Sequence, residues 1–211
     1  MKVLIACEES QAVTIEFRKL GHEAYSCDLV ECTGGHPEWH LKMCALDAIN
    51  LKAWDMIIAF PPCTHLSAAG AMYWKQKSED GRQQAAIDFV YAIRDSDCEF
   101  IAIENPTGKL NSVWRKPDQI INPFQFGEPF KKRTCLWLKG LPKLVDTDLV
   151  EPLYHYTSNS TRGGKLKDGT RKKSNLPIYK PWDSSRDRSK TFTGIAKAMA
   201  SQWGCLELKG R

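Results

Sequence analysis

The sequence predicts an α/β protein with a mainly parallel sheet and helices on both faces. Apolar, strand-like segments alternate with amphipathic, helix-like segments from the first residues onward, which is the pattern of β-α-β units. The segment Ala53–Phe60 is apolar on both faces, as expected of a strand buried inside such a sheet. It ends at Pro61-Pro62, which cannot donate ladder hydrogen bonds and therefore ends the pairing.

Each element has its own local signal. Short apolar runs predict the strands, and apolar side chains at helical spacing predict the helices, with Val13 and Phe17 marking the buried face of the first helix. Ser10 is a good N-cap for that helix and Gly21 a good C′ residue. The elements expected in chain order are strands at Val3–Cys7, His22–Cys27, Ala53–Phe60, Glu99–Ile103 and Arg133–Leu138, the last one antiparallel, and helices at Gln11–Leu20, Arg82–Arg94 and Gly194–Trp203.

Length and composition indicate one soluble globular domain. The chain has 211 residues, of which 42% are hydrophobic and 26% charged, values that are ordinary for such proteins. Because no apolar run approaches the roughly 20 residues of a membrane span, and Met1-Lys2 leads directly into a strand, we expect neither a membrane segment nor a signal peptide. The eight cysteines form no CxxC pair, which favours a reducing, cytoplasmic setting.

The positive charge is concentrated in one segment. Of the 30 Lys and Arg residues in the chain, ten lie in Thr157–Lys190 together with only three of the 25 acidic residues. Ser158–Lys190 is also rich in Gly, Ser and Pro, which predicts an irregular or mobile insertion there. It contains Tyr179 and Trp182 as well, and a mixture of cations and aromatic rings suits nucleic acid.

A thiol and a carboxylate follow two of the predicted strands. Cys63 comes directly after Pro61-Pro62, and Glu104 directly follows the strand that ends at Ile103. The carboxyl ends of parallel strands are where open α/β sheets bind ligands. Cys63 is therefore a candidate nucleophile and Glu104 a candidate acid. The alternatives are a buried structural thiol for Cys63 and a capping or ion-paired carboxylate for Glu104.

A metal site is a further alternative at residues 32–44. Cys32, His36, His40 and Cys44 are spaced four residues apart and are all residue types that bind zinc. This spacing fits no common zinc finger, and Gly34-Gly35 with Pro37 prevents a single helix from presenting all four. We expect no metal here.

Several motifs resemble those of the DNA (cytosine-5) methyltransferases, in particular the compact, phage-type members. The spacing Asp55-x7-Cys63-x3-Ser67-x2-Gly70 matches the nucleophile motif of that family, and Glu104-Asn105 resembles its Glu-Asn motif, with Pro106 in place of the usual Val. Gly127-x-Pro129 and the basic residues after it resemble the motif that supplies a base-contacting Arg. The resemblance covers roughly residues 1–140 and 190–204 and follows the order of the family's motifs.

The resemblance implies a Rossmann-like sheet that binds S-adenosylmethionine and methylates C5 of cytosine. A thiolate that adds to C6 of cytosine makes C5 nucleophilic, and an acid at N3 assists the addition. Residues 1–140 and 191–211 would form the catalytic domain, and residues 141–190 a small target-recognition region. One departure is the first loop, where Cys7-Glu8-Glu9-Ser10-Gln11 replaces the glycine-rich Phe-x-Gly-x-Gly.

The resemblance also assigns residues to roles. The implied catalytic residues are Cys63, Glu104 and Arg133, which has Lys132 beside it. The implied cofactor-binding residues are Cys7, Glu8, Glu9, Ser10, Asp28, Asp47 (with Cys44 as the competing alignment), Pro62 and Gly194. The implied DNA-binding residues are Ser67, Lys172, Lys173, Lys180 and Arg186.

The implied partner is double-stranded DNA, and no obligate protein partner or membrane is expected. The resemblance places the protein in the cytoplasm of a bacterium or a phage-infected cell, as in restriction-modification. Two alternatives stay open. One is the same chemistry on RNA or a free nucleotide. The other is a catalytically silent nucleic-acid-binding protein on a methyltransferase scaffold.

Overall fold

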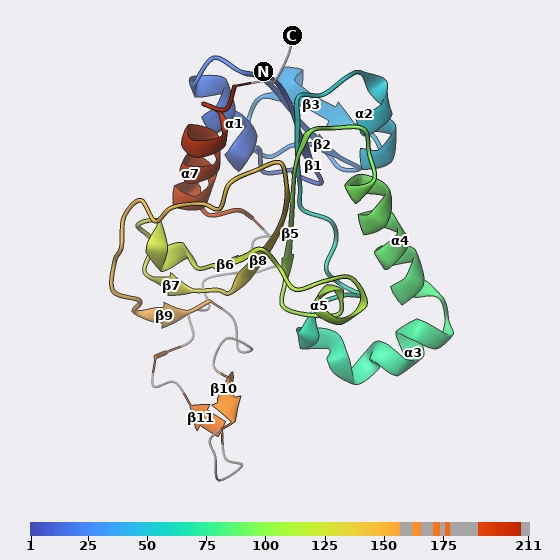
Figure 1. The fold of residues 1–211 in the computed structure, drawn as a ribbon, viewed down its shortest axis with the longest axis vertical. Helices are drawn as coiled ribbons and strands as arrows, with labels where there is room; N and C mark the ends of the chain where they lie inside the picture. Colours follow the sequence, from blue (N-terminus) through green and yellow to red (C-terminus); the bar gives the residue numbers. More distant parts are fainter. Residues whose placement is uncertain (157–161, 166–170, 174–175, 178–189, 208–211) are drawn as a thin grey trace.

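A seven-stranded sheet forms the centre of the molecule (Figure 1). The computed structural model describes residues 1–156, 162–165, 171–173, 176–177 and 190–207. The strands of the central sheet are β1 (Lys2–Ala6), β2 (Glu23–Asp28), β3 (His40–Lys42), β4 (Met56–Ala59), β5 (Phe100–Pro106), β6 (Gln119–Ile121) and β8 (Thr134–Lys139), in the order β3-β2-β1-β4-β5-β8-β6. Strands β1 to β5 pair in parallel, whereas β8 is antiparallel to both of its neighbours. The expected α/β class and the antiparallel late strand are therefore confirmed.

Helices cover both faces of this sheet (Figure 1). Helices α1 (Ala12–Lys19) and α7 (Thr193–Trp203) lie on one face, and α2 (Ala45–Leu51) and α4 (Arg82–Arg94) on the other. The two-residue period of a strand sends alternate side chains to opposite faces. In β1, for example, Val3 and Ile5 join the core under α1 and α7, while Leu4 and Ala6 join the core under α2 and α4.

The structure adds short elements that lack a clear sequence period. They are η1 (Pro37–Trp39), η2 (Ala68–Tyr73), α3 (Trp74–Glu79), α5 (Leu110–Val113), η3 (Pro123–Gln125), β7 (Phe130–Lys131), β9 (Tyr154–His155), β10 (Arg162–Lys165) and β11 (Arg171–Lys173). Strands β10 and β11 pair antiparallel, so part of the segment expected to be irregular is a two-stranded sheet. Its Gly- and Lys-rich strands have no apolar alternation, which is why the sequence did not predict them.

Both ends of α1 are capped, but not entirely as expected. Gly21 has φ +81° and completes a Schellman motif in which its N–H bonds to Arg18 O and the next N–H bonds to Phe17 O. At the other end the N-cap prediction was wrong. Ser10 Oγ is 3.5 Å from Ala12 N, whereas the Glu8 carboxylate accepts bonds from Val13 N at 2.7 Å and Thr14 N at 3.3 Å.

The strand order defines where a ligand is expected. From β1 the chain continues to β2 on one side, and from β4 it continues to β5 on the other. Open α/β sheets bind ligands at such a switch point, beyond the carboxyl ends of the strands. In this molecule that place lies after Ala6 of β1 and Ala59 of β4.

The chain beyond residue 140 still belongs to the body of the protein in part. Leu141 and Leu144 are buried in the same core cluster as α7, and Val145 exchanges two hydrogen bonds with the side chain of Gln202. The division at residues 140 and 191 stays a prediction. Among the helices of the described residues, none is long and apolar enough to cross a membrane.

Candidate active site

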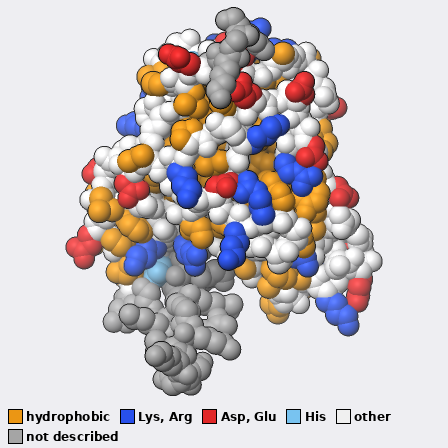
Figure 2. Space-filling view, in the orientation of Figure 1, with side chains coloured by type: hydrophobic (Ala, Val, Ile, Leu, Met, Phe, Trp, Pro, Cys, Tyr) orange, Lys and Arg blue, Asp and Glu red, His pale blue; other side chains and the backbone are white. Residues whose placement is uncertain are grey.

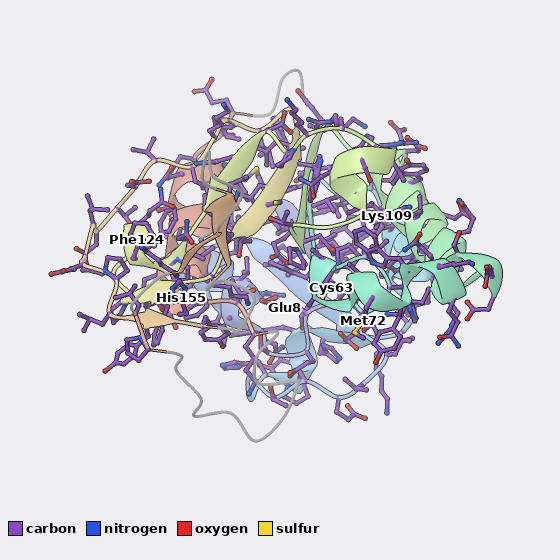
Figure 3. The ribbon with its side chains drawn as sticks, turned by 90° about the horizontal axis from the view of Figure 1, so that it is seen from below. Glu8, Cys63, Met72, Lys109, Phe124 and His155 are labelled. Carbon is purple, nitrogen blue, oxygen red and sulfur yellow. The ribbon has the colours of Figure 1, made fainter. Side chains whose placement is uncertain are left out.

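The segment after β4 presents Cys63 at the sheet edge. Pro61 is buried while Cys63 is exposed, and the chain then turns so that Leu66 N and Ser67 N both bond to Cys63 O, at 3.0 and 2.8 Å. Figure 3 labels Cys63 together with Met72, which lies farther along the same connection. The Pro-Pro turn therefore delivers the thiol to the carboxyl edge, as the sequence suggested.

The loop after Cys63 is joined to the loop after β5. Ala68 N bonds to Thr107 O at 3.0 Å, and Lys109 N bonds to Leu66 O at 2.7 Å. Gly108 permits this approach, since a Cβ at that position would lie 2.1 Å from Leu66 O. Ser67 forms the bridge opposite Gly108 and caps η2 by accepting from Ala69 N.

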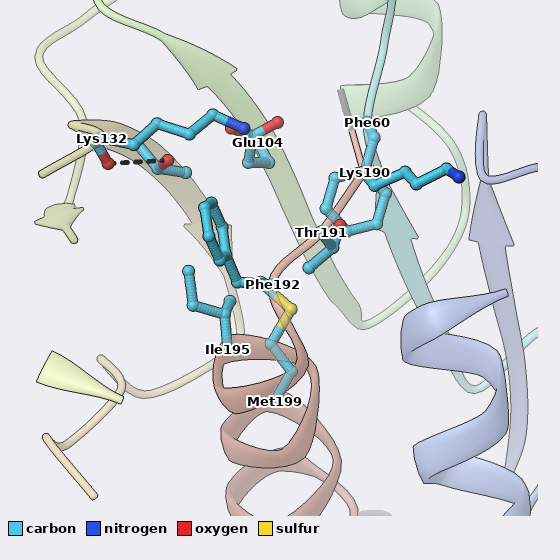
Figure 4. Close-up of a pocket in the computed structure, with 9 residues that line it drawn as sticks. Phe60, Glu104, Lys132, Lys190, Thr191, Phe192, Ile195 and Met199 are labelled. Carbon is cyan, nitrogen blue, oxygen red and sulfur yellow. Dashed lines mark hydrogen bonds between the residues drawn. The ribbon is translucent and has the colours of Figure 1, made fainter. Parts of the chain in front are cut away.

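Glu104 lies on the strand next to the one that leads to Cys63. The register pairs Ala59 with Ile103, so Phe60 and Glu104 stand one step further along at the same edge. In β5, Phe100 and Ala102 face α7, and the strand period turns Glu104 to that side too. It lines a pocket with Phe60, Lys132, Thr134, Lys190, Thr191, Phe192, Ile195 and Met199 (Figure 4).

The structure brings Lys132, and not Arg133, into this pocket. The Lys132 side chain points toward the Glu104 carboxylate (Figure 4), while Arg133 is exposed and does not line the pocket. The strand period explains this placement, because Leu136 and Thr134 face α7 and the same alternation leads back to Lys132. Applied to the sequence, this alternation could have identified Lys132. The base-contacting role suggested for Arg133 stays a prediction.

Cys63, Glu104 and Lys132 influence one another electrostatically. Burial raises the pKa of Glu104, and the charge of Lys132 opposes that shift. Desolvation of the sulfur and the charge of Glu104 raise the pKa of Cys63, again against Lys132. Burial lowers the pKa of Lys132, and the negative charges of Glu104 and Cys63 oppose this. The three groups therefore act as one titrating cluster.

The candidate cofactor residues lie at the carboxyl ends of β1 and β2. Cys7 has φ +60° directly after β1, and burial together with the charge of Asp28 raises its pKa to about 12. Cys44, the N-cap of α2, also acts on Cys7, whereas Asp47 is exposed on α2. The structure thus gathers Cys7, Asp28 and Cys44 at one edge, with the exposed Pro62 following β4.

The acidic residues of the first loop are tied to protein groups. Besides its two backbone bonds, Glu8 accepts a bond from Thr14 Oγ1 at 2.7 Å and is 4% exposed. Glu9 accepts from Thr33 Oγ1, and its backbone oxygen accepts from Thr33 N. Glu8 thus caps a helix from inside the protein, and the cofactor contact that the resemblance implied for it stays a prediction.

Gly194 lies in the first turn of α7, where the backbone of Phe126 crosses it. A Cβ at Gly194 would lie 1.8 Å from Phe126 O, and Gly194 N donates to Glu128 Oε1 at 3.2 Å. Glycine is therefore required here by packing, whatever the role of this residue toward a cofactor.

The candidate DNA-binding residues lie largely in the basic segment. Lys172 and Lys173 belong to β11, and Lys180 and Arg186 lie outside the described residues. A row of Lys and Arg side chains follows the lower border of the described surface (Figure 2).

The metal alternative finds no support in the geometry. His40 uses both ring nitrogens, at 2.8 Å from Ser26 Oγ and 2.9 Å from Val30 O. His36 stacks on Trp39 with ring centroids 3.9 Å apart. Within the described residues, no cluster of three or more His, Cys, Asp or Glu side chains is arranged to hold a metal ion.

Comparisons with known proteins agree with the fold. No family model and no curated protein matches the sequence. Among solved structures, the chain is similar to the Entamoeba histolytica methyltransferase EhMeth, with a TM-score of 0.51 and 14% identity over 70% of this chain and 57% of that one. The mixed α/β fold is therefore one that a methyltransferase also has.

Two further structures give lower scores. The S. pombe Dnmt2 methyltransferase has a TM-score of 0.42 and 14% identity, covering 67% of this chain and 50% of its own. A protein described as a DNA modification methyltransferase encoded within an E. coli prophage has a TM-score of 0.41 and 14% identity. The match covers 64% of this chain and 45% of that one. The chain thus spans about half the length of the structures it matches.

Proposed function

We propose that this protein transfers a methyl group from S-adenosylmethionine to C5 of cytosine in DNA through a covalent adduct with Cys63. The observation that carries the proposal is the placement of Cys63 after β4 and of Glu104 in the carboxyl-terminal part of the adjacent parallel strand β5, with Lys132 facing Glu104. A nucleophile and an acid on neighbouring strand ends, beside a pocket, is the arrangement that covalent catalysis on a heterocyclic base requires.

Cys63 and the pocket residue Glu104 have complementary tasks in this reaction. The Cys63 thiolate adds to C6 and forms a C–S bond, while the displaced electron pair moves toward C5. Protonated Glu104 hydrogen-bonds N3 and favours this addition, and its raised pKa helps it to hold the proton. After C5 has taken up the methyl group, a solvent base accepts the C5 proton, and the electron pair of that C–H bond expels the Cys63 sulfur as a thiolate. The C–S bond breaks and the methylated base is released. The cytosine must leave the duplex to reach the pocket, as in other enzymes that act on a base.

S-adenosylmethionine would supply an electrophilic methyl group when bound. The edge formed by Cys7 and Asp28 suits it, because the Asp28 carboxylate is half-exposed and its one hydrogen bond within the described part of the chain is to its own turn, from Val30 N at 3.3 Å. Such a carboxylate can accept hydrogen bonds from ribose hydroxyls.

The closed N-terminus of α1 favours a cofactor without phosphate. Phosphates bind the free N–H groups at helix N-termini, but the Glu8 carboxylate already accepts from the N–H groups of Val13 and Thr14. The N-terminus of α1 therefore offers no open site for a phosphate group. S-adenosylmethionine carries no phosphate, so this loop suits it better than a dinucleotide.

Nucleoside mass spectrometry tests the proposal directly. Unmodified duplex DNA incubated with the protein and S-adenosylmethionine should give 5-methyldeoxycytidine. Cys63→Ala should abolish the product while leaving the fold intact, and Cys205→Ala, which removes another exposed thiol, should leave product formation unchanged. Product formation by Cys63→Ala at the wild-type rate would refute the covalent mechanism.

The glycine-free first loop favours one alternative, a nucleic-acid-binding protein without catalysis. Cys7 and Gln11 both have φ near +60° without being glycine, so the loop differs from the usual cofactor cradle. Calorimetric titration with S-adenosylmethionine separates the two functions. Binding supports the enzyme, whereas no binding together with retained DNA affinity supports the silent protein. The same incubation with RNA or free cytidine nucleotides tests those substrates.

A further inference from the structure

Lys132 is the lysine of the pocket whose side chain points toward the Glu104 carboxylate. Its side chain points toward Glu104, whereas the ammonium group of Lys190, on the segment before α7, points away from Glu104 (Figure 4). The neighbouring Arg133 is exposed and outside the pocket lining. Of these three cations near the described pocket, Lys132 alone faces the carboxylate.

Two aromatic rings hold Lys132 in this position. Its Nζ lies 5.0 Å from the ring centroid of Tyr156 and 5.5 Å from that of Phe192. These rings also contact each other at 4.7 Å in an edge-to-face arrangement. Cation–π contacts of this kind restrain an ammonium group in place and do not remove its positive charge. Lys132 is thereby kept beside Glu104 of β5, and its charge also acts on Cys63 in the segment after β4.

The proposed reaction needs an unusual distribution of charge. Cys63 must be a thiolate and Glu104 must be protonated, although a carboxylate is ordinarily the stronger acid. The reactive state forms when a proton passes from Cys63 to a Glu104 carboxylate oxygen. The S–H bond breaks, an O–H bond forms, and the electron pair stays on sulfur. The two groups carry one negative charge before and after this step.

We propose that the Lys132 ammonium group stabilises the Cys63 thiolate by balancing the single negative charge that Cys63 and Glu104 share. This role rests on the proposed function, because that reaction is what requires the thiolate. Because the charge of one cation acts on both groups, the proton can change sites while the cluster stays neutral. An ammonium group in this position also replaces the arginine implied for this motif, and it can lose its proton at alkaline pH.

Alkylation of Cys63 by iodoacetamide measures the thiolate without DNA or cofactor, since the thiolate is the reactive form. Peptide mass spectrometry should follow Cys63 in the intact protein between about pH 6 and pH 9. Lys132→Met should slow alkylation about tenfold near neutral pH, equivalent to about one unit in the thiol pKa. Lys132→Arg should keep most of the rate. Lys131→Met, the matched loss of a neighbouring charge, should change the rate less than about twofold.

Glu104→Gln provides an independent test, because it should change the alkylation rate of Cys63 in the opposite direction to Lys132→Met. Removing the carboxylate removes a negative charge that raises the pKa of Cys63, so alkylation should become faster. Equal rates for Lys132→Met and Lys131→Met would overturn the proposal, and so would a Glu104→Gln variant that is not accelerated. If DNA is not methylated but Lys132→Met still slows alkylation, the charge balance holds and the assigned reaction is wrong.

Discussion

The Asn105 side chain donates a hydrogen bond of 2.8 Å to the main-chain oxygen of Pro61, and Asn105 is 1% exposed. This bond joins the end of β5 to the turn that presents Cys63. Because the strand period turns Glu104 toward α7, Asn105 faces the opposite side. One dipeptide thus supplies an acid to the pocket and a brace for the nucleophile.

Asn105→Ala should weaken both stability and turnover. The buried Pro61 carbonyl would lose its side-chain donor, which costs about 1–3 kcal/mol, and Cys63 would be held less precisely. We expect a lower kcat with an almost unchanged affinity for S-adenosylmethionine. Asn50→Ala is a matched control, since that exposed side chain also donates to a carbonyl, at Leu46 O. Urea denaturation and turnover assays measure both effects, and wild-type behaviour of Asn105→Ala would contradict the bracing role.

Glu8 should make stability depend on pH. Burial raises the pKa of Glu8 from 4.5 to about 7 in the folded protein, against the bonds from Val13 and Thr14. Between these values the folded protein binds a proton that the unfolded chain releases. The stabilising contribution is complete below about pH 4.5 and is lost as the pH rises through 7, by about 3 kcal/mol.

Comparison with Glu8→Gln isolates this effect. The unfolding free energy of the wild type should decrease relative to that of Glu8→Gln as the pH rises from about 4.5 to 7. Glu9→Gln removes a carboxylate from the same loop as a control. The difference in unfolding free energy between wild type and Glu9→Gln should depend less on pH. A parallel pH dependence of wild type and Glu8→Gln would show that Glu8 keeps an ordinary pKa.

Gly194 should be sensitive to the addition of a single methyl group. Alanine would place its Cβ 1.8 Å from Phe126 O, which forces the backbone apart at an estimated cost of about 3 kcal/mol. Gly21→Ala is a useful comparison, since its φ of +81° is strained for alanine but no atom lies within 4 Å, and about 1 kcal/mol is expected. If Gly194→Ala keeps its stability yet fails to bind S-adenosylmethionine, the residue is a cofactor contact and packing is secondary.

The sequence was sufficient to predict the helices and strands whose apolar residues recur at a clear helical or strand spacing. Helix α4 has the predicted bounds Arg82–Arg94, and the strands that lead to Cys63 and Glu104 were found because apolar runs end abruptly there. The three-residue strand β6 (Gln119–Ile121) and the segment Ala68–Glu79 were not predicted. Short elements of this kind are fixed by tertiary contacts, which a local pattern does not contain.

The site was predictable where a residue's place follows from a strand end. Choosing between Lys132 and Arg133 required the strand period to be extended beyond β8. The role of Glu8 was not predictable, because its burial depends on the positive φ of Cys7 and on bonds to the first turn of α1. A glutamate in a loop gives no such signal in the sequence.

Neutralising Lys172 and Lys173 should weaken DNA binding in a salt-dependent manner. These residues lie in β11 within the segment that holds the positive excess of the chain. Each phosphate contact releases a counterion, which adds about 0.9 to the slope of log affinity against log salt concentration. Lys172→Gln together with Lys173→Gln should therefore reduce the slope by as much as about 2 and weaken binding to all sequences similarly.

A control double variant, Lys19→Gln with Lys75→Gln, removes the same charge elsewhere. These two lysines are exposed on α1 and α3. If both double variants have the same slope, the basic segment makes no specific contribution to phosphate binding.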